Sequence, residues 1–244
     1  MHPILFKIDG FSFYTHGLLA VLGIIAGSAT IYFLAQRARL KTEYLFDNTV
    51  YTVLAGIVGA RLTYFFLYRD QFSSIKEIFF LWNGGLVSYG GFLLGGLTIF
   101  LLLRSQKENM WRWLDLYSIG FAVGLALGRI GNIFAGEYDG IATASKFAIS
   151  GLIPVTLYES ILLFVLFGIL LTLYLSRKIS EKAGTAFALL LAGYGLGRFI
   201  IDFWRAEKLL FWDITLGQVV SLLVMLAGLF LLFNINRIKR KEKI

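Results

Sequence analysis

The 244-residue sequence contains no cysteine, only two prolines and two histidines, and few charges, which make up 16% of its residues. Without cysteine the chain forms no disulfide, offers no thiolate to a metal and supplies no cysteine nucleophile of its own. No cluster of histidine and acidic residues has the spacing of metal ligands, so we expect no metal site. Both prolines, Pro3 and Pro154, precede long apolar runs and interrupt none of them.

Apolar residues are abundant: they make up 58% of the sequence and give a mean hydropathy of +0.75. Soluble domains are nearer half apolar and a quarter charged, so the composition indicates a protein that crosses a membrane several times. The net charge of +8 is compatible with nucleic acid, but in a membrane protein it favours anionic lipid, and we expect no nucleic-acid partner. No linker or repeat divides the chain, which predicts one domain over residues 1–244.

Apolar runs of about 20 residues are long enough to cross the hydrocarbon core of a bilayer. The sequence contains seven of them, near residues 13–36, 47–69, 84–104, 113–134, 154–176, 184–204 and 213–234. We therefore predict an all-α integral membrane protein with seven transmembrane helices.

The distribution of basic residues predicts the orientation of these helices, because lysine and arginine are enriched on the cytoplasmic side. Fourteen of the 23 lie at one set of helix ends: Arg37, Arg39, Lys41, Arg104, Lys107, Arg112, Arg177, Lys178, Lys182, Arg237, Lys239, Arg240, Lys241 and Lys243. Six lie at the opposite ends and three within the spans. The N-terminus is therefore predicted to lie outside and the C-terminus in the cytoplasm.

With this topology, the strongly polar residues within the spans all fall in the half of the bilayer that faces outside. They are His16, Arg61, Tyr89, Arg129, Asn132, Glu159, Arg198 and Asp202. An arginine at the bilayer centre costs about 2.5–3.5 kcal/mol on insertion scales, so something must offset that cost. Structural ion pairs scattered by chance would not all choose one side, and we infer a functional site there.

The spacing of these residues places several of them on shared helix faces. Arg198, Asp202 and Arg205 follow at i, i+4 and i+7, and Arg129 and Asn132 at i and i+3. The guanidinium fork matches phosphate oxygens, so such arginines are typical of a phospholipid headgroup site. The alternative is that the arginines pair only with nearby carboxylates. Those carboxylates are Glu137, Glu159 and Asp202.

His16 and Tyr89 also fall in this outer half. His16 is the only histidine besides His2 and the only conventional base near the arginines. The alternative for both rings is an anchoring role, since aromatic and imidazole side chains favour the membrane interface.

Several motifs follow one another along the chain. They are Gly59-Ala-Arg61 before Tyr64, Asn83-Gly-Gly-Leu-Val-Ser-Tyr89, Gly128-Arg129-Ile-Gly-Asn132 with Gly136-Glu137 and Gly140, Leu157-Tyr158-Glu159, and the run from Tyr194 to Arg205. Together they resemble the motifs of the bacterial prolipoprotein diacylglyceryl transferase family over nearly the whole chain.

The resemblance implies an enzyme of the bacterial plasma (inner) membrane with its active site facing the outer leaflet. Such an enzyme transfers the diacylglyceryl group of phosphatidylglycerol to the lipobox cysteine thiol of a prolipoprotein signal peptide and releases glycerol phosphate. The nucleophile then belongs to the second substrate, and no cofactor is implied.

The motif match also implies roles for individual residues. Arg129 would bind the phosphate, and Arg198 would stabilise the charge that develops on the leaving glycerol phosphate. His16 and Tyr89 are the remaining catalytic candidates, because the thiol must lose its proton before it attacks. The substrate-binding candidates are Arg129, Asn132, Glu137, Gly140, Glu159, Asp202, Arg61 and Arg205.

Two departures from the family pattern concern these rings and one carboxylate. The family has histidine where Tyr89 stands and tyrosine where His16 stands, and Asp202 replaces a glutamate. The identity of the base is therefore open between His16 and a positive field from the arginines. Two rival functions also remain: a transferase of the same fold with a different acceptor, and a transporter of anions or anionic lipids, although an apolar inner half argues against transport.

Overall fold

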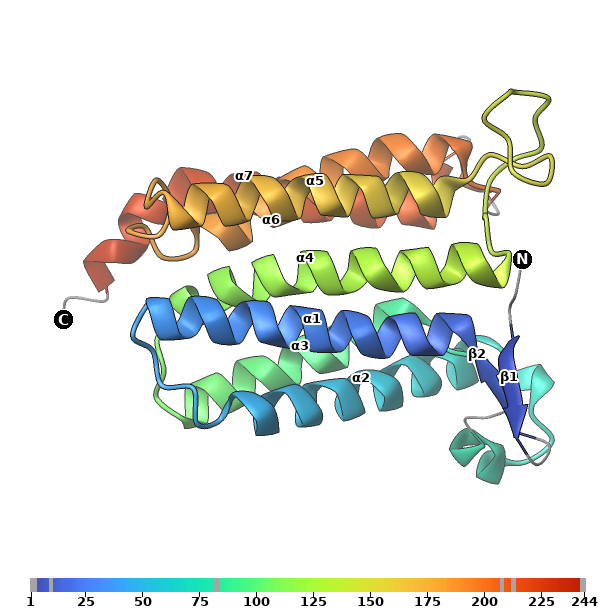
Figure 1. Ribbon diagram of the computed structural model, residues 1–244, viewed down its shortest axis with the longest axis horizontal. Helices are drawn as coiled ribbons and strands as arrows, with labels where there is room; N and C mark the ends of the chain where they lie inside the picture. The colour runs from blue at the N-terminus through green and yellow to red at the C-terminus, as the bar shows by residue number, and fades with distance from the viewer. Residues whose placement is uncertain (1–3, 9–10, 81–83, 207–208, 212–213, 242–244) are drawn as a thin grey trace. The chain divides into compact units, whose positions relative to one another are not determined.

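The computed structural model describes residues 4–8, 11–80, 84–206, 209–211 and 214–241 (Figure 1). Within these residues, seven helices are long and apolar enough to cross a membrane. They are α1 (Thr15–Arg37), α2 (Leu45–Leu67), α3 (Ser88–Ser105), α4 (Met110–Ala135), α5 (Val155–Leu175), α6 (Thr185–Ile201) and α7 (Leu216–Lys241). Each coincides with one predicted span, which confirms the all-α transmembrane fold. Which ends face the cytoplasm stays a prediction.

Short elements that hydropathy does not predict lie near the helix ends. Two antiparallel hairpins are formed by β1 (Ile4–Ile8) with β2 (Phe11–Tyr14) and by β3 (Leu209–Phe211) with β4 (Ile214–Thr215). Three 3-10 helices are η1 (Arg69–Gln71), η2 (Ile75–Phe79) and η4 (Asp202–Trp204). Segments of two to five residues are too short to produce a recognisable period in the sequence. Of the motif residues, Asn83 lies outside the described part of the chain.

The helices group into two compact units, residues 1–37 with 114–244 and residues 38–113. The first unit contains α1, nearly all of α4, α5, α6 and α7, and the second contains α2 and α3. That residues 1–244 form one domain stays a prediction. Many large apolar side chains on these helices are exposed, among them Phe233 (84%) and Phe46 (77%). Such surfaces suit contact with lipid and not with water.

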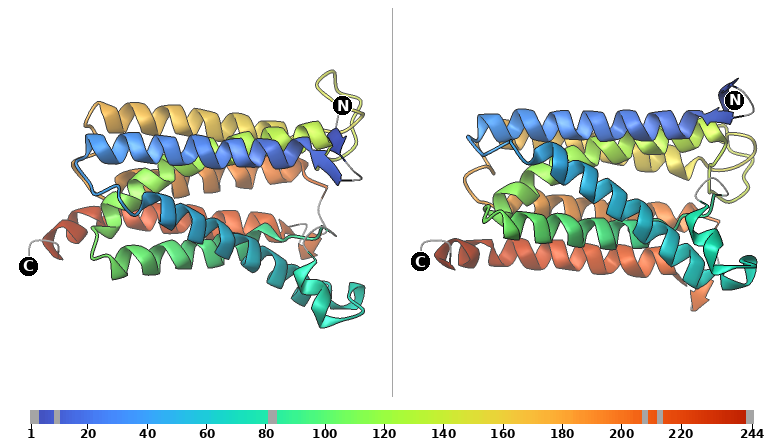
Figure 2. Two further views of the ribbon diagram at one scale, coloured as in Figure 1. Left: turned by 60° about the horizontal axis from the view of Figure 1, so that its bottom comes forward. Right: turned by 90° about the horizontal axis from the view of Figure 1, so that it is seen from below.

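Close backbone approaches hold the first unit together. Figures 1 and 2 show α1 beside α4, and a Cβ at Gly27 would lie only 2.8 Å from the carbonyl oxygen of Gly120. Between α6 and α7, a Cβ at Gly195 would lie 2.6 Å from the amide nitrogen of Met225. Small residues at such crossings let membrane helices pack tightly, as the glycine spacing along these helices predicts.

A buried carboxylate joins the opposite end of α4 to the start of α6. Asp115 accepts hydrogen bonds from the amides of Gly184 (2.8 Å) and Phe187 (2.9 Å). A carboxylate at a helix N-terminus satisfies otherwise unpaired amides and interacts favourably with the helix dipole. This contact fixes the positions of α4 and α6, which both carry arginines at their other ends.

Candidate functional site

The polar centre of the first unit is Glu159, whose side chain is fully buried near the start of α5. Pro154 precedes this helix and ends the loop from α4, so Glu159 lies on the second helical turn. Three arginines from three segments converge on its carboxylate. Arg129 Nε lies 2.8 Å from Oε2, Arg198 Nη1 lies 3.0 Å from Oε1, and Arg205 Nη2 also contacts Oε1.

A second buried carboxylate, Asp202, begins η4 directly after α6. Its Oδ1 accepts a hydrogen bond from Arg205 Nε at 3.0 Å, and its Oδ2 lies 3.6 Å from Arg198 Nε. The i, i+4 spacing on α6 predicted that these side chains share one face. Asp139, in the loop after α4, adds a third carboxylate 3.1 Å from Arg205 Nη1.

The charges of this cluster do not balance within its buried part. Three guanidiniums meet two fully buried carboxylates, while the third carboxylate, on Asp139, is 41% exposed. Burial lowers the pKa of the Arg205 guanidinium, but its carboxylate neighbours raise that pKa above the ordinary value by a larger amount. All three arginines therefore stay charged, and the buried part of the cluster carries one net positive charge.

Only two of these arginines have donors to spare. Among the described residues, Arg129 Nη1 and Nη2 and Arg198 Nη2 have no hydrogen-bond partner, and each side chain is 14% exposed. Arg198 Nη1 also donates to the Tyr194 hydroxyl at 3.2 Å. Arg205, in contrast, contacts a carboxylate through each of its three nitrogens. Arg129 and Arg198 can therefore bind an added anion, whereas Arg205 is already occupied.

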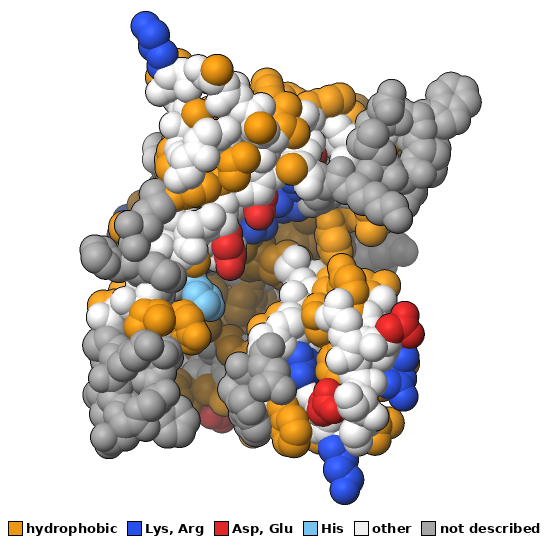
Figure 3. Space-filling model, turned by 90° about the vertical axis from the view of Figure 1, so that its right-hand side faces the viewer, with side chains coloured by type: hydrophobic (Ala, Val, Ile, Leu, Met, Phe, Trp, Pro, Cys, Tyr) orange, Lys and Arg blue, Asp and Glu red, His pale blue; other side chains and the backbone are white. Residues whose placement is uncertain are grey.

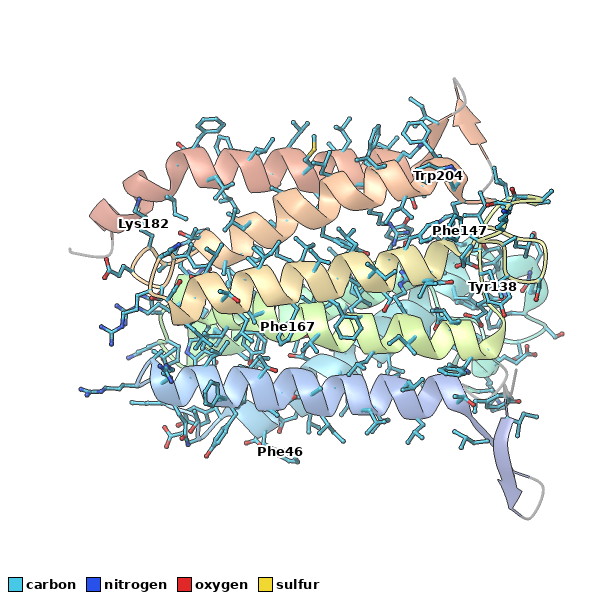
Figure 4. The ribbon with its side chains drawn as sticks, turned by 45° about the horizontal axis from the view of Figure 1, so that its top comes forward. Phe46, Tyr138, Phe147, Phe167, Lys182 and Trp204 are labelled. Carbon is cyan, nitrogen blue, oxygen red and sulfur yellow. The ribbon has the colours of Figure 1, made fainter. Side chains whose placement is uncertain are left out.

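Figure 3 looks onto one end of the molecule, where acidic and basic side chains gather among hydrophobic ones. An apolar pocket of the first unit adjoins the charged cluster along the sequence, since Tyr158 precedes Glu159 and Trp204 precedes Arg205. It is lined by Thr143, Ser145, Phe147, Ala148, Ile153, Pro154, Tyr158, Ile201 and Trp204. Figure 4 shows Phe147 and Trp204 at the same end of this unit.

The other motif residues after α4 shape the loop. Asn132 and Glu137 are joined by a backbone hydrogen bond of 2.9 Å, and no ion pair involves the exposed Glu137 side chain among the described residues. Gly140 is buried and pairs with Arg205 in a β-bridge. A Cβ at this position would overlap the carbonyl oxygen of Ile153. Glycine at 140 is therefore required by a close backbone approach.

His16 lies on the first turn of α1 and is solvent-exposed. A Cβ at Gly131 of α4 would lie 2.9 Å from the Cα of His16, so the histidine is beside the turn that carries Arg129 and Asn132. Its ring also lies near the Tyr14 ring, with centroids 5.6 Å apart. An imidazole and a phenol thus occur together at this helix start.

In the second unit, Tyr89 lies on the first turn of α3 and is 36% exposed. Arg61 of α2 is 3% exposed, and its donors are all directed to backbone carbonyls. These belong to Glu77, Ile78, Phe80, Gly84 and Gly85. The Phe72 ring lies 5.2 Å from its guanidinium carbon. Because carbonyls occupy these donors, Arg61 holds its own loop, and a role in substrate binding stays a prediction.

Comparison with known proteins agrees with these motifs. Residues 3–234 match the model of the prolipoprotein diacylglyceryl transferase family. The chain belongs to this family. It is 29% identical to the phosphatidylglycerol–prolipoprotein diacylglyceryl transferase of Finegoldia magna over the full length of both chains. A Clostridium botulinum protein of the same name is 28% identical over all of this chain and 99% of its own, and one from Trichormus variabilis is 29% identical over 93% and 87%.

Membership of the prolipoprotein diacylglyceryl transferase family makes two residues of interest that the sequence analysis missed. Asp139 pairs with Arg205, and Tyr14 lies beside His16. Both stand next to residues of interest in the sequence, since Asp139 precedes Gly140 and Tyr14 is two positions before His16. Neither is separated from other exposed polar residues by periodicity, so the only available signal was this adjacency.

Within this family member, Glu159→Gln tests whether the buried carboxylate holds the arginines together. We expect a loss of stability of about 3–5 kcal/mol, because removing one partner leaves buried charges uncompensated. Thermal unfolding of the purified protein in detergent measures it. Glu181→Gln, at an exposed position, is the matched control and should leave the midpoint unchanged. Equal midpoints for both variants would contradict the central position of Glu159.

Arg61→Lys tests the loop-holding role in the second unit. An ammonium cannot donate to five carbonyls at once, so we expect a loss of stability of about 2–4 kcal/mol from charged hydrogen bonds left unmade. The control is Arg69→Lys, because the exposed Arg69 makes a single long hydrogen bond of 3.4 Å to Phe72. An unfolding midpoint that does not differ between the two variants would refute the role.

Proposed function

We propose that this protein transfers the diacylglyceryl group of phosphatidylglycerol to the cysteine thiol of a prolipoprotein signal peptide and releases glycerol phosphate. The observation that carries the proposal is the arrangement of Arg129 and Arg198, which share the Glu159 carboxylate and keep unpaired donors. The family relationship supplies the reaction, and the cluster supplies a place for its phosphate.

The headgroup of phosphatidylglycerol is a phosphodiester with one negative charge. The buried part of the cluster has one net positive charge, from three guanidiniums and two carboxylates. Binding the lipid therefore neutralises the site. Bidentate guanidinium–phosphate contacts are among the stronger hydrogen bonds in proteins, and Arg129 has two free nitrogens suited to them.

In the transfer step the cysteine sulfur attacks the glyceryl carbon that is bonded to the phosphate oxygen. The carbon–sulfur bond forms, the carbon–oxygen bond breaks, and its electron pair leaves with glycerol phosphate. A singly charged diester thus becomes a doubly charged monoester. Arg198 is placed to stabilise this second charge, since it is fixed by Glu159 and Asp202 before the reaction begins.

The proton of the thiol requires an acceptor, because the thiolate is the nucleophile. His16 is our candidate, since its backbone lies against Gly131, between Arg129 and Asn132. Tyr89, on α3, is the second candidate for proton transfer. We further propose that the enzyme resides in the bacterial inner membrane with this site facing the outer leaflet, as the lysine and arginine distribution predicts.

Incubation of the purified protein with phosphatidylglycerol and a peptide that contains a lipobox cysteine tests the function. We expect the peptide mass to increase by one diacylglyceryl group and glycerol phosphate to be released in equal amount. A peptide with serine in place of the cysteine should stay unmodified.

Other outcomes of this experiment would identify the rival functions. Release of glycerol phosphate without a modified peptide would indicate a different acceptor. Movement of labelled lipid across proteoliposomes, with neither product formed, would indicate transport.

A further inference from the structure

The loop between α4 and α5 is fastened to the segment that follows η4. The amide of Ala206 donates to the Asp139 carbonyl at 2.8 Å, and the amide of Ile141 donates to the Trp204 carbonyl at 2.9 Å. Side chains reinforce this pairing, since Asp139 Oδ2 lies 3.1 Å from Arg205 Nη1. Figure 4 shows Tyr138 and Trp204, the sequence neighbours of this ion pair, at one end of the unit.

Arg205 connects this fastening to the buried cluster. Its Nη1 contacts Asp139, its Nε donates to Asp202 at 3.0 Å, and its Nη2 contacts Glu159 Oε1. The same Glu159 oxygen lies 3.0 Å from Arg198 Nη1. A planar guanidinium held at three points has a fixed position and orientation. Arg205 therefore fixes the oxygen on which Arg198 depends.

Asp139 has an unusual backbone conformation, with a φ of +57°. Residues other than glycine rarely adopt this left-handed region, although aspartate and asparagine do so more readily than most. Such a conformation persists where surrounding contacts impose it. Here the backbone bonds to Ala206 and the ion pair to Arg205 supply those contacts.

We propose that Asp139 is a positioning residue that holds Arg205, which holds Glu159 and through it Arg198. This inference rests on the proposed function. Neither Asp139 nor Arg205 contacts the lipid: Arg205 has no free nitrogen, and Asp139 carries the same sign of charge as the headgroup. The two residues act on the rate of transfer through Arg198.

The pairing itself can be tested without any substrate. Asp139→Asn suits the left-handed backbone and removes only the charge. In thermal unfolding in detergent, it should lower the midpoint of the otherwise natural protein. In an Arg205→Lys background it should have little effect, because one ammonium cannot contact three carboxylates at once. Additive losses in this cycle would refute the pairing.

Transfer kinetics then test the positioning role. We expect Asp139→Asn to lower kcat about three- to tenfold, the effect of losing one partly exposed charged hydrogen bond. The KM for phosphatidylglycerol should stay level or fall, since a negative charge beside an anion site has been removed. In the Arg205→Lys background the same substitution should leave kcat unchanged. Glu181→Gln is the matched control, at an exposed position, and should alter neither constant.

Two results would overturn the positioning role. A higher KM with normal kcat would mean that Asp139 contacts the lipid, and a normal kcat with a normal KM would mean that Arg205 needs no clamp. If the natural protein transfers nothing to the peptide, the proposed function fails, while the unfolding cycle still decides whether Asp139 and Arg205 are coupled.

Discussion

Replacing either Arg129 or Arg198 by lysine should reduce transfer by about 10²–10³-fold, the cost of losing a well-placed donor to developing charge. Lysine keeps the positive charge but has a single donor nitrogen, so it cannot bind Glu159 and a phosphate oxygen in the same planar arrangement. Each arginine has such a double task, with one nitrogen at 2.8 or 3.0 Å from Glu159 and others unpaired.

The two variants should differ in kinetic character. Arg129→Lys should raise the KM for phosphatidylglycerol, since Arg129 offers two free nitrogens to the bound headgroup, whereas Arg198→Lys should mainly lower kcat. Steady-state rates with a lipobox peptide separate these effects. Arg37→Lys, at the exposed end of α1, is the control for the exchange itself. Near-normal turnover in both folded variants would contradict the assignment of the headgroup site.

Removing the imidazole of His16 should have an effect of similar size. We expect His16→Gln to reduce transfer by about 10²–10⁴-fold, the usual range when a general base is lost. Only a neutral imidazole can accept the thiol proton, so activity of the natural enzyme should be present at neutral and alkaline pH and lost as acid protonates the ring. The variant should lose this acid limb of the pH–rate profile.

The neighbouring phenol provides a control for this experiment. Tyr14→Phe keeps the ring that lies 5.6 Å from the imidazole and removes only the hydroxyl. If His16 is the base, Tyr14→Phe should have a much smaller effect than His16→Gln. A mild phenotype for His16→Gln, in protein shown to be folded, would mean that the arginines alone activate the thiol.

The seven helices could be predicted from the sequence because lipid imposes a strong and simple requirement: each span needs about 20 apolar residues. The convergence of Arg129 and Arg198 was also predictable in outline, since intramembrane charges need partners and the i, i+4 spacing puts Arg198 and Asp202 on one face. That Glu159 is the shared partner depends on tertiary packing of α4, α5 and α6, which local patterns do not encode.

The same limit explains what sequence patterns left out. Arg61 is buried without a carboxylate partner among the described residues, and the carbonyls that surround it come from a loop with no periodic signal. Asp139 is exposed and lies in a loop, so only the backbone pairing with Ala206 and the contact with Arg205 give it a role. Both cases depend on where irregular segments fold back.

A structure of the protein with bound phosphatidylglycerol tests the central claim most directly. The account predicts phosphate oxygens about 2.7–2.9 Å from guanidinium nitrogens of Arg129 and Arg198, the usual length of such charged contacts. Glu159 should stay in contact with both arginines, and Arg205 should stay with its three carboxylates. A headgroup bound elsewhere, with Arg129 and Arg198 paired only to Glu159 and Asp202, would contradict the account.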